Sequence, residues 1–496
     1  MRAPSRIVAP SAAALIGSLR GIGYSLKTAI ADLIDNSITA GAAVVEITFE
    51  WGGGVPRISI LDNGRGMTDS ELELAMKFGG AGPHQARDAA DLGRFGLGLK
   101  TASLSQCRRL TVASLQAGRC SVLRWDLDYI RDVSDAWELL EGAAPGSEAC
   151  LKALSSRSAG TLVIWELIDF GRRDDVIGHS AFLEDIEALE KHLALVFHRF
   201  LNGDARQLTI RLNDRKVVAW DPFLENHPST RRRPEQALGS GTGRVMVRGF
   251  TLPHRDRFRD EREYLAAGGP AGWNAQQGFY IYRNKRLLAG GGWLGLGGSR
   301  VWTREESSRL GRIRIDIPNT ADQDWNIDVK KSVARPPASL RPRLSMIAQD
   351  IRSNAREVFV HRGSYGPRSK SEEIERIWEP AQTSDRVGYR IRRTHPAVVA
   401  ATPTEAAERA AFNSLLTLTE RTVPVDRIWL DVTEKPGSVQ ANQISGIDPD
   451  LAEAARGLGA MLIRKGLSKA AAAEKVSRLD PYDTIPGFAE MLALNL

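Results

Sequence analysis

Residues Tyr24–Gly41 read YSLKTAIADLIDNSITAG, and their periodicity predicts an amphipathic helix. Ile30, Leu33 and Ile34 form its apolar stripe. No Lys or Arg stands beside the carboxylates of the other stripe to relieve their repulsion, so this face favours a site for Mg²⁺ and water, because a hard cation prefers oxygen ligands. A solvated helix face is the alternative explanation. The polar stripe has the spacing i, i+3, i+4 and i+7 and consists of Asp32, Asp35, Asn36 and Thr39.

Two later segments place glycines beside polar groups. The predicted strand Ile58–Leu61 runs into Asp62-Asn63-Gly64-Arg65-Gly66-Met67, where a strand-end carboxylate and two glycines suit a ligand approached by the backbone. An ordinary Asp-Asn-Gly turn would leave Gly66 and Met67 unexplained. Further on, Gly93-Arg94-Phe95-Gly96-Leu97-Gly98-Leu99-Lys100-Thr101 opens a predicted helix. Backbone N–H groups and the helix dipole at such a start favour an anion.

The glycine loop at residues 93–101 matches neither of two common phosphate-binding motifs. Leu99 occupies the place where a Walker A loop needs lysine. The glycines are spaced GxxGxG instead of GxGxxG, and no predicted strand leads directly into them, which excludes a Rossmann fingerprint.

Composition sets broad limits on the protein class. A chain of 496 residues with 42% hydrophobic and 26% charged residues is typical of a soluble globular protein, and its length favours about three domains. No apolar run approaches the roughly 20 residues that span a membrane. The N-terminal segment is expected to be mature protein, with a signal peptide as the minor alternative. Three cysteines without a CxxC pair favour a reducing, cytoplasmic compartment and no zinc site. The net charge of +7 permits a nucleic-acid partner without requiring one.

Taken together, the motifs resemble the Bergerat nucleotide-binding fold shared by DNA gyrase B, Hsp90, MutL and histidine kinases, the GHKL ATPases. Helix DLIDN, strand end DNGRGM, loop GRFGLGLK and strand GTLVIWE follow one another in this order across residues 11–170. The MORC branch and its bacterial relatives look most similar, on GRFGLGLK, the FGG at Phe78–Gly80, GFYIYRNKRLL at Gly278–Leu288 and WNIDVKKS at Trp325–Ser332. A histidine kinase fits less well, because no phospho-acceptor histidine segment precedes the helix.

The resemblance implies a role for each motif residue. Asp32 would orient and activate the attacking water, with Asp35 able to share that task. Asn36 would ligate the Mg²⁺ that bridges the ATP phosphates. Asp62 would accept a hydrogen bond from the adenine amino group. The remaining nucleotide-binding residues would be Gly64, Gly66 and Met67 at the base, Gly93, Phe95, Gly96, Leu97, Gly98 and Lys100 at the phosphates, and Thr161 at the adenine pocket.

Two positions depart from the family pattern. The family usually has Glu where Asp32 stands and often has Asp where Thr39 stands. Aspartate is one methylene shorter, which removes about 1.5 Å of reach, and the positioning of a reacting water is sensitive at that scale. The predicted hydrolysis is therefore slow.

Residues 176–365 resemble the ribosomal-protein-S5-like transducer domain of the same enzymes. In gyrase B and MutL a lysine from this domain reaches the γ-phosphate, and Lys330 and Lys331 are the candidates here. Only one of them can point inward if the segment is extended, and both being surface lysines is the alternative. A contact that ATP makes and ADP lacks would bias closure of an N-terminal dimer, to which residues 1–23 would contribute.

The predicted fold class is α+β: a Bergerat-type α/β sandwich at residues 1–175, the S5-like domain at 176–365, a linker at 366–395 and a mainly helical region at 396–496. The predicted function is that of a low-turnover ATPase with ATP and Mg²⁺ as cofactors. The resemblance further implies a dimerising clamp that acts on DNA with a partner nuclease or another subunit of a bacterial defence system. An Hsp90-like clamp on protein clients and an ATP-gated scaffold with little hydrolysis are the alternatives. A run of charge is usually a solvated loop, and DNA contact is the less common alternative for the cluster of Arg231, Arg232, Arg233, Arg255, Arg257 and Arg259.

Overall fold

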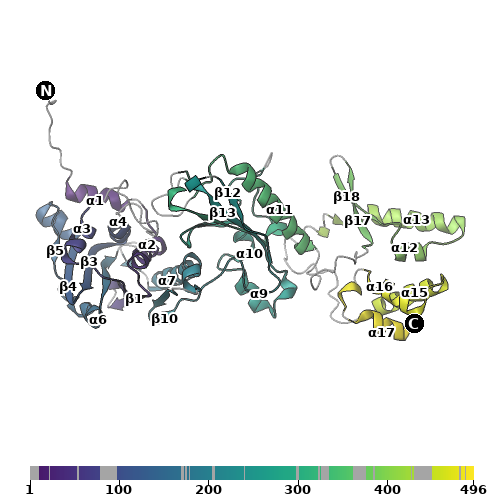
Figure 1. Ribbon diagram of the computed structural model, residues 1–496, viewed down its shortest axis with the longest axis horizontal. Helices are drawn as coiled ribbons and strands as arrows, with labels where there is room; N and C mark the ends of the chain where they lie inside the picture. The colour runs from purple at the N-terminus through teal and green to yellow at the C-terminus, as the bar shows by residue number, and fades with distance from the viewer. Residues whose placement is uncertain are drawn as a thin grey trace, which may run out of the picture. The chain divides into compact units, whose positions relative to one another are not determined.

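The structure is a computed structural model in which the chain forms two compact units, Met1–Gly363 and Ser364–Leu496 (Figure 1). No helix of the described part of the chain is long and apolar enough to cross a membrane. The described residues are 11–21, 23–52, 55–78, 98–168, 172–173, 176–177, 179–203, 207–239, 241–297, 301–321, 324–325, 334–360, 376–383, 386–425, 427–428, 449–479, 482–485 and 487–496.

The first domain is built on an eight-stranded sheet with the order β10-β9-β1-β2-β6-β3-β4-β5. Neighbouring strands are antiparallel except for the parallel pair β1 and β9. The parallel pair is reached through the long helical connection that such pairing requires. The strands are β1 (Val44–Gly52), β2 (Val55–Asp62), β3 (Cys107–Gln116), β4 (Arg119–Asp126), β5 (Leu140–Glu141), β6 (Gly160–Ile168), β9 (Thr209–Leu212) and β10 (Arg215–Lys216).

Side-chain alternation along these strands gives the sheet two buried faces. On β2, Ile60 joins the main core under the helices, whereas the next residue, Leu61, joins a smaller cluster on the opposite face, against Leu154. In the described part of the chain, the helical layer packs on the larger face, and the short helical segment at residues 148–155 packs on the smaller one. The helices are α1 (Ala12–Arg20), α2 (Leu26–Thr39), α3 (Asp69–Met76), α4 (Gly98–Leu104), α5 (Leu127–Tyr129), α6 (Lys152–Ser155), α7 (His179–Val196) and α8 (His198–Leu201).

Two of these helices begin with a capping box. The Ser25 hydroxyl accepts a hydrogen bond from the backbone of Thr28 at the start of α2. Thr68 and Glu71 bond reciprocally at the start of α3, in the Thr-x-x-Glu spacing typical of a capping box. Because the first N–H groups of a helix lack intrahelical partners, these boxes fix where each helix begins, and thus where the segment before it ends.

The second domain is a mixed sheet with the order β11-β13-β16-β14-β15, in which β12 also pairs with β13. Strands β14 and β16 are parallel, and α11 packs against β13 and β16. Asn284 and Lys285 have positive φ values of 46° and 69°, so a two-residue turn joins β14 to β15. The elements are β11 (Arg231–Arg232), β12 (Gln236–Leu238), β13 (Val245–Thr251), α9 (Glu261–Ala267), α10 (Gly272–Ala275), β14 (Gly278–Arg283), β15 (Arg286–Gly290), β16 (Gly311–Ile317) and α11 (Arg341–Val360).

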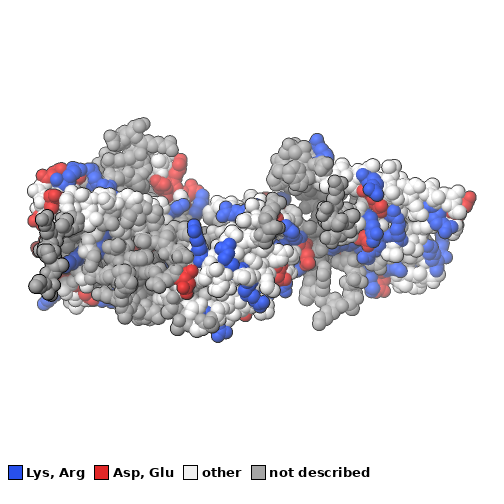
Figure 2. Space-filling model, turned by 90° about the horizontal axis from the view of Figure 1, so that it is seen from above, with Lys and Arg blue, Asp and Glu red and all other residues white. Residues whose placement is uncertain are grey.

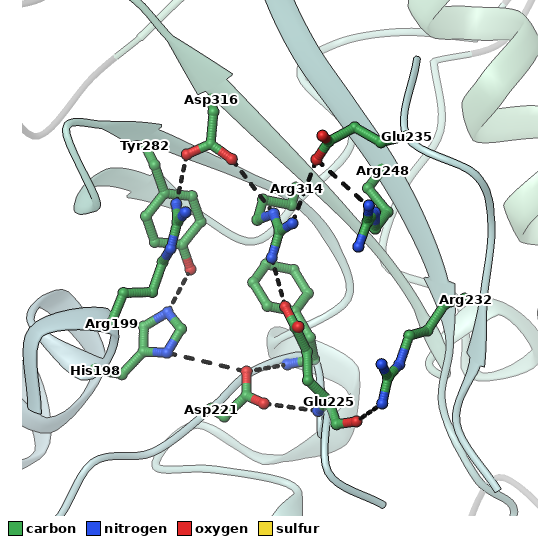
Figure 3. A network of polar contacts seen from close by, with 11 residues as sticks. His198, Arg199, Asp221, Glu225, Arg232, Glu235, Arg248, Tyr282, Arg314 and Asp316 are labelled. Carbon is green, nitrogen blue, oxygen red and sulfur yellow. Dashed lines mark hydrogen bonds and ion pairs between the residues drawn. The ribbon is translucent and has the colours of Figure 1, made fainter. Parts of the chain in front are cut away.

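A polar network ties α8 to the second sheet (Figure 3). His198 Nε2 lies 2.8 Å from the Tyr282 hydroxyl of β14. The next residue of α8, Arg199, forms an ion pair with Asp316 of β16. Burial, with help from Arg199 and Arg314, lowers the pKa of His198 to about 3, so the imidazole is neutral near pH 7. The contact with Tyr282 is therefore an uncharged hydrogen bond in a buried setting, which fixes the position of β14.

The second unit is mainly helical. It includes an antiparallel hairpin inside the range predicted as a linker, 366–395, and a helical cluster around Ala455, Leu462 and Phe488. The predicted α+β class is confirmed: an α/β sandwich is followed by a second sheet domain and a mainly helical C-terminal region. The elements of this unit are β17 (Trp378–Thr383), β18 (Arg386–Ile391), α12 (Pro396–Ala401), α13 (Ala406–Arg421), α15 (Pro449–Arg464), α16 (Lys469–Ser477) and α17 (Phe488–Asn495).

Candidate functional site

Three segments predicted to form one site lie together in the first domain: helix α2, the end of strand β2 and the start of helix α4. A Cβ atom placed on Gly98, the first residue of α4, would lie 3.7 Å from Asp32 Oδ2 of α2. One turn further along α2, the Ser37 hydroxyl donates to Asp62 Oδ2 of β2 at 2.9 Å. Helix α2 thus connects the glycine segment to the strand-end carboxylate.

Asp62 is a buried acceptor held by three donors. Besides Ser37, the backbone N–H groups of Gly64 and Thr161 donate to Asp62 Oδ1 at 2.8 Å and 3.3 Å. Burial raises the pKa of this carboxyl group, and the three hydrogen bonds oppose the rise. A buried carboxylate with a fixed orientation can select a ligand that presents an N–H donor. A ligand without such a donor would leave the buried carboxylate oxygen without a hydrogen bond, which is costly in free energy.

A second row of polar atoms continues from Thr161 into the sheet. The hydroxyls of Thr161 and Ser114 are 3.1 Å apart, and the Met67 backbone N–H donates to Ser114 Oγ at 2.8 Å. Ser114 and Thr161 are direct partners across β3 and β6. The antiparallel register therefore places both hydroxyls beside the turn that follows β2. Met67 lies in this turn, just before the start of α3.

The two glycines after Asp62 allow close backbone contacts. Gly66 has φ +70°, and a Cβ there would lie 2.1 Å from the carbonyl oxygen of Leu115. A Cβ on Gly64 would lie 2.8 Å from the Cβ of Ala40 at the end of α2. Any side chain at these positions would push the turn away from β3 and from α2, so the site needs glycine there.

The polar stripe of α2 divides between two environments. Asp32 and Asp35 are buried, whereas Asn36 and Thr39 are exposed. The Tyr24 hydroxyl donates to Asp32 Oδ2 at 3.0 Å. Arg286 Nε of β15 lies 3.4 Å and 3.2 Å from the two oxygens of Asp35, and Arg286 Nη2 lies 4.0 Å from Asp32 Oδ1. The cation that the local sequence lacks is thus supplied by a residue 251 positions away.

Asn36 is the one predicted metal ligand, and it lies on the exposed side of α2. Among the described residues, no group of three or more His, Cys, Asp or Glu side chains is placed to hold a metal ion. A single amide oxygen fits Mg²⁺ that is carried mainly by phosphates and water, since this ion keeps much of its hydration when bound. The residues present therefore fit a magnesium–nucleotide complex better than a metal bound by the protein alone.

Lys100, which is predicted to lie near the phosphates, contacts the end of α3 and an aromatic ring in the structure. Its ammonium donates to the Ala75 carbonyl at the end of α3 at 2.7 Å and lies 5.9 Å from the centre of the Phe78 ring. The side chain is buried, and burial lowers the pKa of Lys100 to about 8. In this arrangement the lysine closes the C-terminal end of α3, where a positive charge is favourable.

Several predicted residues lie outside the described part of the chain, and sequence reasoning missed others inside it. The missed residues are Tyr24, Ser37, Ser114 and Arg286, which contact the predicted residues. Ser37 could have been found, because it lies next to Asn36 in the helix. Arg286 follows an Asn-Lys turn, but nothing in the sequence around it indicates a contact with α2. Gly93, Phe95, Gly96, Leu97, Lys330 and Lys331 lie outside the described residues, as do residues 1–10 of the predicted dimer contact.

Comparison with known proteins supports the interpretation of this region as nucleotide-binding. Residues 24–161 match the family described as "Histidine kinase-, DNA gyrase B-, and HSP90-like ATPase". This match supports the predicted GHKL superfamily for residues 24–161, whereas the MORC branch stays a prediction.

Curated relatives with matching segments are bacterial proteins named "DNA mismatch repair protein MutL". The chain is 31% identical over 255 residues to the Herminiimonas arsenicoxydans protein, which is 48% of this chain and 38% of that relative. It is 34% identical over 121 residues to the Rhodospirillum rubrum protein, which is 24% of this chain and 17% of that relative. The similarity thus spans less than two fifths of the length of these relatives.

Proposed function

We propose that this chain binds ATP with Mg²⁺ in the site between α2, β2 and α4 and hydrolyses it slowly. The single observation that carries the proposal is the buried Asp62 carboxylate, oriented by Ser37, Gly64 and Thr161 at the end of β2. Such an acceptor suits the amino group of adenine. The adjacent row from Thr161 to Ser114 supports the same pocket.

The first domain offers a separate group for each task of hydrolysis. Asp32 would orient the attacking water, because the Tyr24 hydroxyl and the Arg286 guanidinium fix its carboxylate close to Gly98. Asp35 is less suited to that task, since it is fully buried against Arg286. Asn36 would hold Mg²⁺, which supplies neutralisation of the phosphate charge. Catalysis would rest on positioning and electrostatics, which is what phosphoryl transfer requires.

The finer proposal is a nucleotide-driven dimeric clamp of the MORC type that acts on DNA in the cytoplasm with a partner nuclease or another defence-system subunit. The relatives' name, which refers to DNA mismatch repair, supports the DNA part. Arg231 and Arg232 lie exposed on β11, at the edge of the second sheet. On the face seen in Figure 2, Lys and Arg are interspersed with Asp and Glu, so DNA would be bound through individual arginines and not through one continuous basic patch.

Many of the predicted DNA-contacting arginines already have a carboxylate partner. Arg233 lies 3.0 Å from Asp350, Arg255 lies 2.5 Å from Glu261, and Arg259 lies 3.3 Å from Asp260. These ion pairs are exposed, so the arginines would exchange their carboxylate partners for DNA phosphates at little cost in free energy. DNA binding of this kind is expected to weaken steeply as salt is added, because each phosphate contact releases counterions.

Phosphate release from ATP tests the proposal, with and without DNA, in the parent chain and in Asp32→Asn and Asn36→Ala. We expect measurable turnover that both substitutions reduce by about 100-fold, the scale on which misplacement of a reacting group acts. Asp132→Asn, an exposed position paired with Arg131, is the matched control and should keep parent activity. Parent-like turnover in Asp32→Asn would show that Asp32 is not the base, and no turnover in the parent would contradict the enzymatic proposal. Stimulation by DNA would support the clamp on DNA, and stimulation by protein clients alone would contradict it.

A further inference from the structure

The β14–β15 hairpin of the second domain reaches into the acidic face of α2. Arg283 and Arg286 face each other across the two-residue turn. The Arg286 side chain is 4% exposed and the Asp35 side chain 0% exposed, so their ion pair is closed off from water. Arg286 Nη1 also donates to the Leu287 carbonyl at 2.7 Å, which fixes the direction of the guanidinium.

The same hairpin is anchored at its other strand. Tyr282 pairs with Leu287 across the hairpin, and its hydroxyl meets His198 of α8 within the network of Figure 3. Helix α7, which precedes α8, contacts both α2 and β15. The position of Arg286 at the acidic helix therefore depends on how the second sheet is docked on α7 and α8.

A buried ion pair of this kind is poor evidence for stability alone. Removing a guanidinium and a carboxylate from water is costly. A protein in which apolar residues of similar volume replace such a pair is often equally stable. The pair joins two domains at the one helix that carries the proposed base. Arg286 also lies 4.0 Å from Asp32, whose other oxygen receives the Tyr24 hydroxyl. Aspartate has less reach than glutamate, so the position of the Asp32 carboxylate relative to the reacting water must be set by neighbours such as Tyr24 and Arg286.

We propose that Arg286 is a positioning residue for Asp32, through which docking of the second domain sets the rate of hydrolysis. It holds α2 through Asp35 and lies beside Oδ1 of Asp32, whereas the Tyr24 hydroxyl donates to Oδ2. A shift of the β14–β15 hairpin would release both contacts together. This inference rests on the proposed ATPase function and adds to it a residue that the nucleotide motifs do not contain.

The test compares kcat for ATP with the Kd of a non-hydrolysable ATP analogue in Arg286→Met, Arg286→Lys and the parent chain. We expect Arg286→Met to lower kcat about 10- to 100-fold while Kd changes less than about 3-fold, because positioning acts on the reaction more than on binding. Arg286→Lys should recover part of the loss, since it restores a charge. Lys285→Ala, at the exposed tip of the same turn, is the matched control and should behave like the parent.

Circular dichroism establishes first that each variant is folded. If Arg286→Met does not fold, the double variant Asp35→Asn/Arg286→Gln replaces it, because it removes both charges of the buried Arg286–Asp35 pair. A kcat in the double variant below that of Asp35→Asn alone supports the inference, and an equal kcat overturns it. Parent-like kcat in Arg286→Met overturns the inference and leaves the ATPase proposal standing. A parent chain that binds no nucleotide overturns both.

Discussion

Asp62 is buried at the end of β2 and accepts hydrogen bonds from three different segments. Its contribution to ligand binding can be distinguished from its contribution to the stability of the fold. Its pKa is raised because burial penalises the charged form. A carboxyl group whose pKa is higher in the folded than in the unfolded state stabilises the fold most at low pH, and that contribution is lost as the pH rises through the folded value. The charged form of the Asp62 carboxyl group is thus disfavoured by the fold, which fits a residue whose role is to bind a ligand.

Replacing Asp62 with Asn should weaken nucleotide binding without weakening the fold. The amide keeps an acceptor for the N–H groups of Gly64 and Thr161, but it presents a donor where the proposed adenine amino group needs an acceptor. We expect binding to weaken about 10- to 100-fold, the value of a hydrogen bond to a charged group. The unfolding free energy at pH 7 should equal or exceed that of the parent. Titration calorimetry and urea unfolding measure the two quantities, and a large loss of stability with intact binding would contradict this account.

The buried side chain of Lys100 leads to a prediction of how the unfolding free energy depends on pH. Its pKa falls from 10.5 to about 8 in the folded chain because of burial. Between these two values the unfolded chain holds more protons, so the unfolding free energy should rise with pH, by about 3 kcal/mol if the full shift is realised. Below about pH 8 this contribution is lost.

Lys100→Met removes the titrating group while it keeps a similar apolar length. Urea unfolding measured at several pH values between 7 and 10 should show a smaller rise with pH in the variant than in the parent. Identical slopes in the two chains would mean that Lys100 keeps its ordinary pKa and that another group supplies the pH dependence.

At the scale of elements, the sequence predicts most of the first domain because local signals agree with the fold there. The capping residues Thr68 and Glu71 mark the start of α3, and alternation marks the strands of the central sheet. Residue types predict a turn at residues 213–216 and a return strand at residues 217–220, but the strand that pairs with β9 is Arg215–Lys216, so this prediction is wrong. The Val217 N–H still bonds to the Ile210 carbonyl, whereas the Trp220 N–H bonds to the Ala194 carbonyl near the end of α7. A partner that lies in another element cannot be found from strand propensity.

The α3 capping box can be tested by a matched pair of substitutions. Thr68→Ala removes the acceptor for the Glu71 N–H and should lower the unfolding free energy by about 1 kcal/mol. Glu71→Gln keeps the reciprocal bond to the Thr68 N–H and should cost less. Urea unfolding of both variants decides the matter, and equal losses would indicate that charge at the helix start matters more than the box.

At the scale of the molecule, the acidic helix shows what sequence reasoning cannot reach. The segment 24–41 predicts a helix with an oxygen-rich face, and the structure describes that helix at Leu26–Thr39. Relief of the charge on Asp35 comes from Arg286 of another domain, through a contact that only the folded chain creates. The roles of the glycine loop at residues 93–97 and of Lys330 and Lys331 remain predictions.

ATP-driven dimerisation is the prediction that belongs to the whole chain. With a non-hydrolysable ATP analogue and Mg²⁺, sedimentation velocity should show a shift from monomer to dimer, because a ligand that prefers the closed state draws the equilibrium toward it. ADP should produce a smaller shift, and removal of residues 1–10 should weaken the dimer. A monomer that is unchanged by the analogue would contradict the clamp while leaving nucleotide binding intact.

The central claim is that α2, the end of β2 and the start of α4 form one adenine-nucleotide site. Calorimetric titration of the parent chain with a non-hydrolysable ATP analogue and Mg²⁺ tests it most directly. The predicted result is saturable binding of one nucleotide per chain, which Asp62→Asn weakens and Asp132→Asn does not. The absence of any binding heat in the folded parent, at several temperatures, would contradict the claim.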